Sequence, residues 1–135
     1  MVVIFYLSDQ NSTASSMTSL KILDNWFGEI VLKILSYFLT YNQSIEFVRE
    51  TAHAIEFLIL GFLILRTIFY SGNTIGKRII LISLLFSVLY AVSDEIHQIF
   101  VEGRVFQLLD IGLDSLGATV GVLTSYFLIR KEEKV

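Results

Sequence analysis

The chain has 135 residues, of which 54% are hydrophobic, and its mean hydropathy is +0.69. These values exceed those of soluble globular proteins and indicate one membrane domain, residues 1–135. The formal net charge of −3 argues against nucleic acid as a partner, because no basic stripe is present to neutralise phosphates. The absence of cysteine excludes disulfides and thiolate metal sites.

The N-terminal segment is apolar but short. Residues 2–7 resemble the end of a spanning helix, yet the first seven residues of the chain would reach only about 10 Å as a helix. We therefore interpret residues 1–8 as the stub of a truncated span. Residues 8–19 are rich in serine and predict a polar loop.

Residues 20–41 have the pattern of an amphipathic helix. Apolar side chains recur at helical spacing from Trp26 to Phe38, and the charged residues fall on the other face. Trp26 and Tyr37 are suited to anchor this helix in the headgroup layer. The alternative is that it packs on the spans of its own chain. A polar break follows, with Ser44 as the expected N-cap of the next helix.

Three apolar blocks predict three full spanning helices, at about residues 51–70, 78–97 and 110–130. A hydrocarbon core of about 30 Å requires about 20 helical residues, which each block supplies together with its flanking turn. The predicted fold class is therefore all-α, an integral membrane helix bundle. It has three full spans, a truncated N-terminal span and an amphipathic interfacial helix.

Lysine and arginine near the ends of the spans predict the orientation. Arg66, Lys77 and Arg78 lie in or beside the connection between the first two full spans, and the C-terminal tail is also basic. We expect a multi-pass protein of the cell membrane, with the 66–78 loop and the C-terminus in the cytoplasm. Eleven of the thirteen carboxylates then lie on the outer side: Asp9, Asp24, Glu29, Glu46, Glu50, Glu56, Asp94, Glu95, Glu102, Asp110 and Asp114.

Ionisable and polar side chains gather near the predicted outer ends of the spans. Arg49, His53 and Glu56 share one helical face at positions i, i+4 and i+7. The second span, the next loop and the start of the third span add seven more: Asp94, Glu95, His97, Gln98, Arg104, Asp110 and Asp114. A charge at membrane depth costs about 2.5–3.5 kcal/mol, so Glu56 and Asp114 should face the bundle interior and pair with Arg49 or Arg104.

Three glycines near this cluster have predicted structural roles. Gly103 is expected to form the turn before Arg104. Gly117 and Gly121 form a small-xxx-small stripe behind Asp114, which predicts close approach of another helix.

The cluster allows more than one function. In an acid–base site, the catalytic candidates are His53, Glu56, Asp94 and His97. The ligand-binding candidates are Arg49, Glu95, Gln98, Arg104, Asp110 and Asp114. The histidine–carboxylate pairs have i, i+3 spacing and could hold a divalent ion, but this spacing is common by chance, so we expect no metal and no cofactor. In the structural alternative, arginine–carboxylate pairs only pin the helices together.

Two runs of sequence resemble the VanZ-like family of bacterial membrane proteins. They read FVRETAHAIEFLILGFLILRTI (47–68) and YAVSDEIHQIFVEGRVFQLLDIGLDSLGATVG (90–121), and residues 5–19 resemble the opening stretch of that family. The D-E-x-H-Q-x-F-x-x-G-R run within the second is specific for it. The chain departs from the family pattern at the shortened first span, at Phe57, where Tyr is common, and at Glu102, where Pro is common.

The resemblance implies a protein of the bacterial cell envelope, associated with reduced susceptibility to lipoglycopeptide antibiotics of the teicoplanin type. A polar site at the outer leaflet would recognise or modify a lipid-linked or lipidated ligand. The expected partner is a membrane lipid or a lipid-linked cell-wall precursor. One alternative is a membrane-embedded hydrolase or transferase that uses the acid–base site. Another is a structural bundle that joins an envelope protein complex or a second copy of itself.

Overall fold

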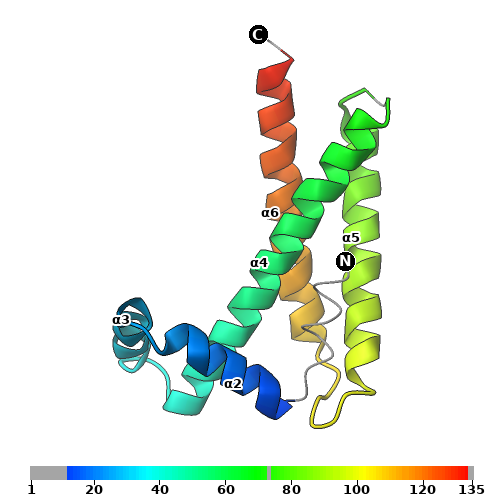
Figure 1. Ribbon diagram of the computed structural model, residues 1–135. Helices are drawn as coiled ribbons and strands as arrows, with labels where there is room; N and C mark the ends of the chain where they lie inside the picture. The colour runs from blue at the N-terminus through cyan, green and yellow to red at the C-terminus, as the bar shows by residue number, and fades with distance from the viewer. Residues whose placement is uncertain (1–11, 73, 134–135) are drawn as a thin grey trace.

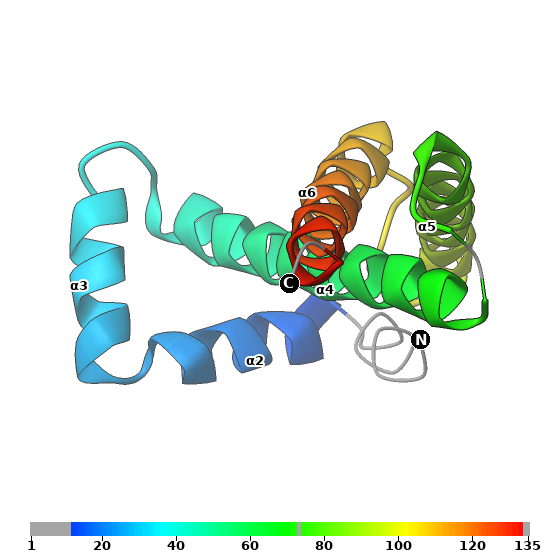
Figure 2. The same cartoon turned by 90° about the horizontal axis from the view of Figure 1, so that it is seen from above.

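The computed structural model describes residues 12–72 and 74–133, and this part of the chain is helical without strands. Its helices are α2 (Ser12–Leu23), α3 (Trp26–Leu35), α4 (Tyr41–Tyr70), α5 (Lys77–Gln98) and α6 (Leu108–Glu132). The long helices α4, α5 and α6 form a bundle, and α2 and α3 lie beside the first turns of α4 (Figures 1 and 2). The all-α class is confirmed, whereas the predicted stub at residues 1–8 lies outside the described residues.

Three helices are long and apolar enough to cross a membrane: α4 with 30 residues, α5 with 22 and α6 with 25. Only 22% to 33% of the residues in their most apolar windows are buried inside the bundle, so most of that surface is available to lipid. Each helix includes one of the three predicted spans and extends beyond it. The predicted membrane helix bundle is confirmed in this respect.

Helix α4 begins ten residues before the predicted span. The backbone N–H of Thr40 donates a hydrogen bond to the Gln43 side chain at 2.9 Å, which closes the first turn. Ser44, the predicted N-cap, lies inside the helix, where it is buried and donates to the Thr40 carbonyl at 3.1 Å. The prediction for Ser44 was wrong because the capping residue comes one turn earlier. The extra turns carry Arg49 beyond the apolar block.

The serine-rich segment is helical from Ser12 onward, so the loop predicted there was wrong. Serine and threonine have low intrinsic helix propensity, but α2 packs against α3 and α4 and buries Leu23, and tertiary packing overrides propensity. The single amphipathic helix expected over residues 20–41 is divided near Asn25. The Asn25 side chain accepts the Gly28 N–H at 2.9 Å and so caps a separate helix, α3.

Close packing of α4 on α6 depends on small residues. A Cβ added at Gly117 would overlap the carbonyl of Ala54, and one added at Gly121 would overlap the carbonyl of Leu58. Gly61 lies against the backbone of Ala118 in the same way. The predicted close approach at Gly117 and Gly121 is therefore confirmed, with α4 as the partner helix.

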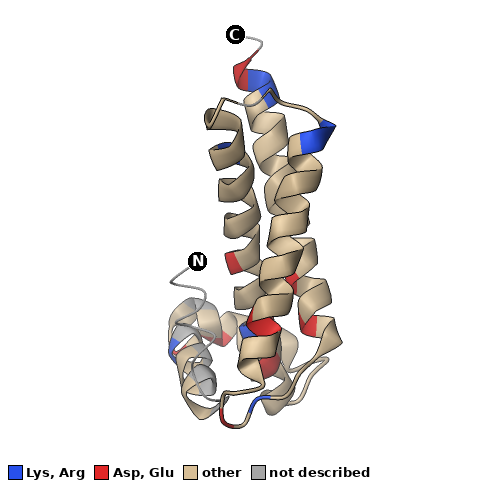
Figure 3. Ribbon diagram, turned by 90° about the vertical axis from the view of Figure 1, so that its right-hand side faces the viewer, with Lys and Arg blue, Asp and Glu red and all other residues tan. Residues whose placement is uncertain are grey.

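The two ends of the bundle differ in charge. Basic residues lie at the end that carries the C-terminus, whereas acidic residues concentrate toward the α5–α6 loop (Figure 3). At the C-terminal end, Arg66 on α4 forms an ion pair with Glu132 on α6 at 2.5 Å, and the Tyr70 hydroxyl lies 3.3 Å from the same carboxylate. This contact joins α4 to α6 at the end opposite the predicted site.

Candidate ligand-binding site

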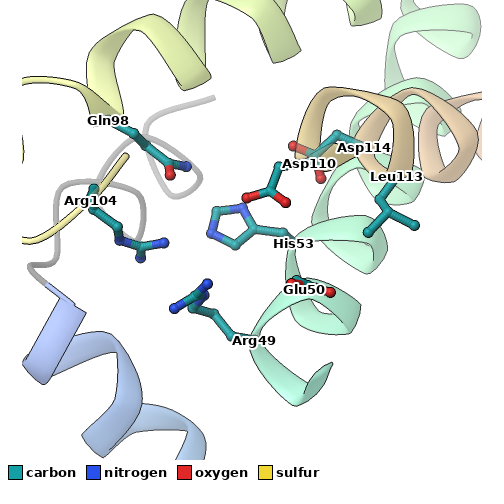
Figure 4. Close-up of a pocket in the computed structure, with 8 residues that line it drawn as sticks. All are labelled: Arg49, Glu50, His53, Gln98, Arg104, Asp110, Leu113 and Asp114. Atoms are coloured by element: carbon teal, nitrogen blue, oxygen red, sulfur yellow. The ribbon is translucent and has the colours of Figure 1, made fainter. Parts of the chain in front are cut away.

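A small pocket lies between α4, α6, the end of α5 and the α5–α6 loop (Figure 4). Eight residues line it: Arg49, Glu50, His53, Gln98, Arg104, Asp110, Leu113 and Asp114. Its enclosed volume is about 10 Å³, which is room for roughly one water molecule. Because four segments supply these residues, the pocket forms only when the bundle is assembled.

Opposite charges occupy different sides of the pocket. Figure 4 shows the guanidinium groups of Arg49 and Arg104 near each other, with the carboxylates of Asp110 and Asp114 on the far side of the His53 ring. His53 is within electrostatic reach of both arginines and of Asp110. The site is therefore bipolar, with the imidazole between its two halves.

The loop that carries Arg104 is fixed at two points. Gly103 has φ of +76°, a left-handed conformation that favours glycine, and the Arg104 N–H donates to the Val101 carbonyl at 3.1 Å. The predicted turn at Gly103 is thus confirmed. Farther along, the buried Glu95 carboxylate accepts the backbone N–H of Gln107 at 2.6 Å, just before α6 begins. These contacts hold the Arg104 side chain over the end of the bundle.

The two arginines lack strong carboxylate partners among the described residues. Nε and Nη2 of Arg104 are buried, and their N–H groups donate to no acceptor within residues 12–72 and 74–133. Burial lowers the pKa of Arg104, Arg49 lowers it further, and nearby carboxylates oppose this effect. Arg49 reaches only Glu46, on its own helix, at 3.8 Å. These guanidinium groups therefore retain donors for another acceptor.

The predicted ion pairs of Glu56 and Asp114 with the arginines are not formed in the described part of the chain. Glu56 is seven residues beyond Arg49, which is about 10 Å along the helix axis. It lies instead within electrostatic reach of Asp94, as does Asp114. Gln98 donates to Asp94 at 3.3 Å, so this deeper group of carboxylates contacts the pocket through Gln98 and Asp114.

Six of the ten predicted site residues line the pocket: Arg49, His53, Gln98, Arg104, Asp110 and Asp114. The other four have different positions. Glu56 and Asp94 belong to the deeper carboxylates, Glu95 holds the loop, and His97 lies on α5 outside the lining. The sequence reasoning missed Glu50 and Leu113. Each lies three residues from a predicted member, His53 and Asp110, so helical spacing alone could have indicated them.

The chemistry available at the pocket is hydrogen bonding, charge pairing and proton transfer. The buried Nδ1 of His53 has no hydrogen-bond partner among the described residues, so it is available to a ligand. Across residues 12–72 and 74–133, no three His, Asp or Glu side chains are grouped so that they could share a metal ion.

Comparison with known proteins gives a family match. The model of the VanZ/LLP1 family matches residues 1–130, which is nearly the whole chain. No curated protein and no solved structure matches it. The family match agrees with the resemblance of residues 47–68 and 90–121, and with the three helices that can span a membrane. The chain therefore belongs to the VanZ/LLP1 family.

Proposed function

We propose that this protein recognises the polar headgroup of a lipid-linked or lipidated ligand at the outer leaflet of the cell membrane. The observation that carries the proposal is the pocket at the ends of the spanning helices, where the buried Nε and Nη2 of Arg104 have no hydrogen-bond partner among the described residues. Buried polar groups in proteins nearly always have a partner. A ligand or ordered water that supplies an acceptor to Arg104 accounts for this exception.

The depth of the pocket suits a lipid headgroup. The apolar block of α4 begins at Ala54, so His53 lies at its edge and Arg49 about 6 Å farther along the axis. The headgroup layer is about 5–7 Å thick on each side of the hydrocarbon core. A lipid that lies beside the bundle would thus bring its polar group to the level of the pocket.

The outer leaflet follows from the positive-inside rule. Lys77 and Arg78 at the α4–α5 turn and the basic end of α6 favour the cytoplasmic side. Because α5 then crosses the membrane, the α5–α6 loop with Arg104 faces outward. Cell-wall precursors and antibiotics with an acyl chain both present polar groups on this side.

The structural alternative receives little support at the pocket. Pinning requires an arginine of one helix to pair with a carboxylate of another, as Arg66 does with Glu132. In contrast, Arg49 contacts a residue of its own helix, and Arg104 has no ion pair within the described ranges. The pocket arginines are therefore better suited to an external ligand than to holding the helices together.

The enzymatic alternative depends on His53. Its Nδ1 is unpartnered within the described residues, and Asp94 and Asp110 are within electrostatic reach of the ring. A histidine beside carboxylates can transfer a proton to or from a bound ligand. We therefore retain a hydrolase or transferase as the second candidate, with His53 as the proton-transfer group.

Antibiotic susceptibility tests the proposal. Expression of the chain in a teicoplanin-susceptible bacterium should raise the inhibitory concentration of teicoplanin, but not that of a glycopeptide without an acyl chain. Arg104→Gln should abolish the effect at matched membrane abundance, whereas Arg78→Gln, at the opposite end, should preserve it. Equal protection by the wild type and Arg104→Gln would contradict the proposed site. Loss at His53→Gln with retained lipid binding would favour the enzymatic candidate.

A further inference from the structure

The pocket contains two positive groups near each other, and among the described residues neither forms an ion pair with a carboxylate of another helix. Arg49 comes from α4 and Arg104 from the α5–α6 loop, and Figure 4 shows both guanidinium groups directed to the same side of His53. Their proximity is unfavourable, because like charges repel and Arg104 is partly removed from water. The nearest carboxylate of Arg49, on Glu46, is 3.8 Å away and exposed.

We propose that Arg49 and Arg104 clasp a phosphate group, with His53 as a third contact. This inference rests on the proposed function and names the chemical class of the headgroup. Phosphate oxygens accept the paired N–H donors of guanidinium in a planar, two-bond geometry, and one tetrahedral phosphate can accept from two arginines. Nε and Nη2 of Arg104, which have no partner in the part of the chain that the structure describes, supply such a pair of donors.

The carboxylates of the pocket restrict where the phosphate can lie. Asp110 and Asp114 lie across the His53 ring from the arginines, so an anion is repelled from that half of the site. A phosphate is therefore confined to the side of Arg49 and Arg104. An ammonium or hydroxyl group of the same ligand would be favoured near the aspartates, because these accept hydrogen bonds.

The size of the cavity determines how the phosphate binds. About 10 Å³ of enclosed space holds a single water molecule and no phosphate. The ligand therefore enters from the open side while the two arginine side chains move apart, which their long stems allow. This geometry suits a terminal phosphate on a lipid, whose acyl chains remain beside the bundle, and it also admits free phosphate.

The test is ligand binding by the full chain purified in a neutral maltoside detergent. Native mass spectrometry would count bound short-chain phosphatidic acid, with diacylglycerol of the same chain length as the uncharged control. We expect the wild type to retain phosphatidic acid, and Arg49→Gln and Arg104→Gln to weaken binding by about tenfold or more. Arg104→Lys keeps the charge but not the paired donors, and it should bind less well than the wild type. Arg78→Gln is the control, because it removes the same charge at the opposite end of the bundle.

A second arm identifies the source of the phosphate. In one outcome, inorganic phosphate binds alone and displaces phosphatidic acid, with the same dependence on both arginines. This result would support the clasp with free phosphate as its ligand. Retention of phosphatidic acid that inorganic phosphate does not displace would support the clasp with a lipid ligand. An equal loss of phosphatidic acid binding in Arg78→Gln would overturn the proposal. The lipid would then be attracted by the general positive charge of the protein and not by the two pocket arginines. Unchanged melting temperature and elution volume of each variant exclude unfolding as the cause.

Failure of the clasp differs from failure of the proposed function. If diacylglycerol and phosphatidic acid bind equally and both glutamine variants retain them, the phosphate assignment is wrong while a lipid site persists. If neither lipid binds and teicoplanin susceptibility is unchanged by expression, the proposed function fails as well.

Discussion

The contact between α4 and α6 makes Gly121→Ala the most direct test of the bundle. A Cβ at this position would lie 2.8 Å from the carbonyl carbon of Leu58 and 2.9 Å from the Phe62 nitrogen, whereas ordinary contact begins at 3.4 Å. The Leu58 carbonyl oxygen lies closer still, so the two helices would have to separate locally by more than about 0.6 Å in a closely packed interface. Forcing one methyl group into such a site costs about 1–3 kcal/mol. We therefore expect the free energy of unfolding to fall by that amount.

Gly112→Ala is the matched control, because a Cβ there has no heavy atom within 4 Å among the neighbours. It lies on the same helix and makes the same chemical change, and alanine favours a helix over glycine by up to about 1 kcal/mol. Steric trapping can measure both variants, since a chain without cysteine accepts two introduced label sites. If Gly121→Ala is as stable as Gly112→Ala, α4 does not contact α6 closely at this point.

Three further predictions concern the membrane and the ends of the bundle. Trp26 is the only tryptophan and is 77% exposed. Its fluorescence emission should therefore shift to the blue in vesicles and be quenched by lipids brominated near the headgroup. An unchanged spectrum would place α3 away from the interface. A single cysteine at Thr13 should be labelled by a membrane-impermeant reagent in intact cells, whereas one at Thr74 should not. The reverse result would mean that the orientation in the membrane is opposite to the predicted one. Arg66→Gln should cost no more than about 1 kcal/mol by steric trapping, because the Glu132 side chain is half exposed; a larger loss would mean that lipid shields this ion pair.

The sequence predicted the spanning helices well because their signal is local. Twenty apolar residues are enough to indicate a span, and Gly117 and Gly121 mark a close contact through their spacing alone. It predicted the end of α4 at Tyr70 correctly but its start poorly, since Ser44 and Thr40 are both plausible caps by residue type. The helical state of the serine-rich segment could not be predicted, because packing of α2 against α3 and α4 depends on residues distant in sequence.

The sequence predicted which residues line the candidate site better than it predicted how they are arranged. Helical spacing placed Arg49 and His53 on one face, and both line the pocket. Spacing within one helix says nothing about depth between helices, so it could not show that Glu56 lies opposite Asp94 and not beside an arginine. It also could not distinguish a carboxylate that binds a ligand from one that holds a loop, as Glu95 does.

Glu95 provides a test that separates positioning from contact. Its buried carboxylate accepts the Gln107 N–H at 2.6 Å and thereby ties the end of the Arg104 loop to α5. A hydrogen bond to a charged group contributes about 1.5–3 kcal/mol, so Glu95→Ala should speed hydrogen exchange at Gln107 by at least about tenfold. Glu102→Ala, in the same loop but exposed, should leave that exchange unchanged.

Binding measured in the same variants decides between the two roles. If Glu95 only positions the loop, phosphatidic acid binding should fall in Glu95→Ala in proportion to the loosening of the loop. Arg104→Gln, in contrast, should weaken binding while the exchange of Gln107 stays slow, because the Glu95 contact is intact in that variant. Loss of binding in Glu95→Ala with wild-type exchange would show that Glu95 contacts the ligand directly. The loop would then be held by its Gly103 turn and the start of α6 alone.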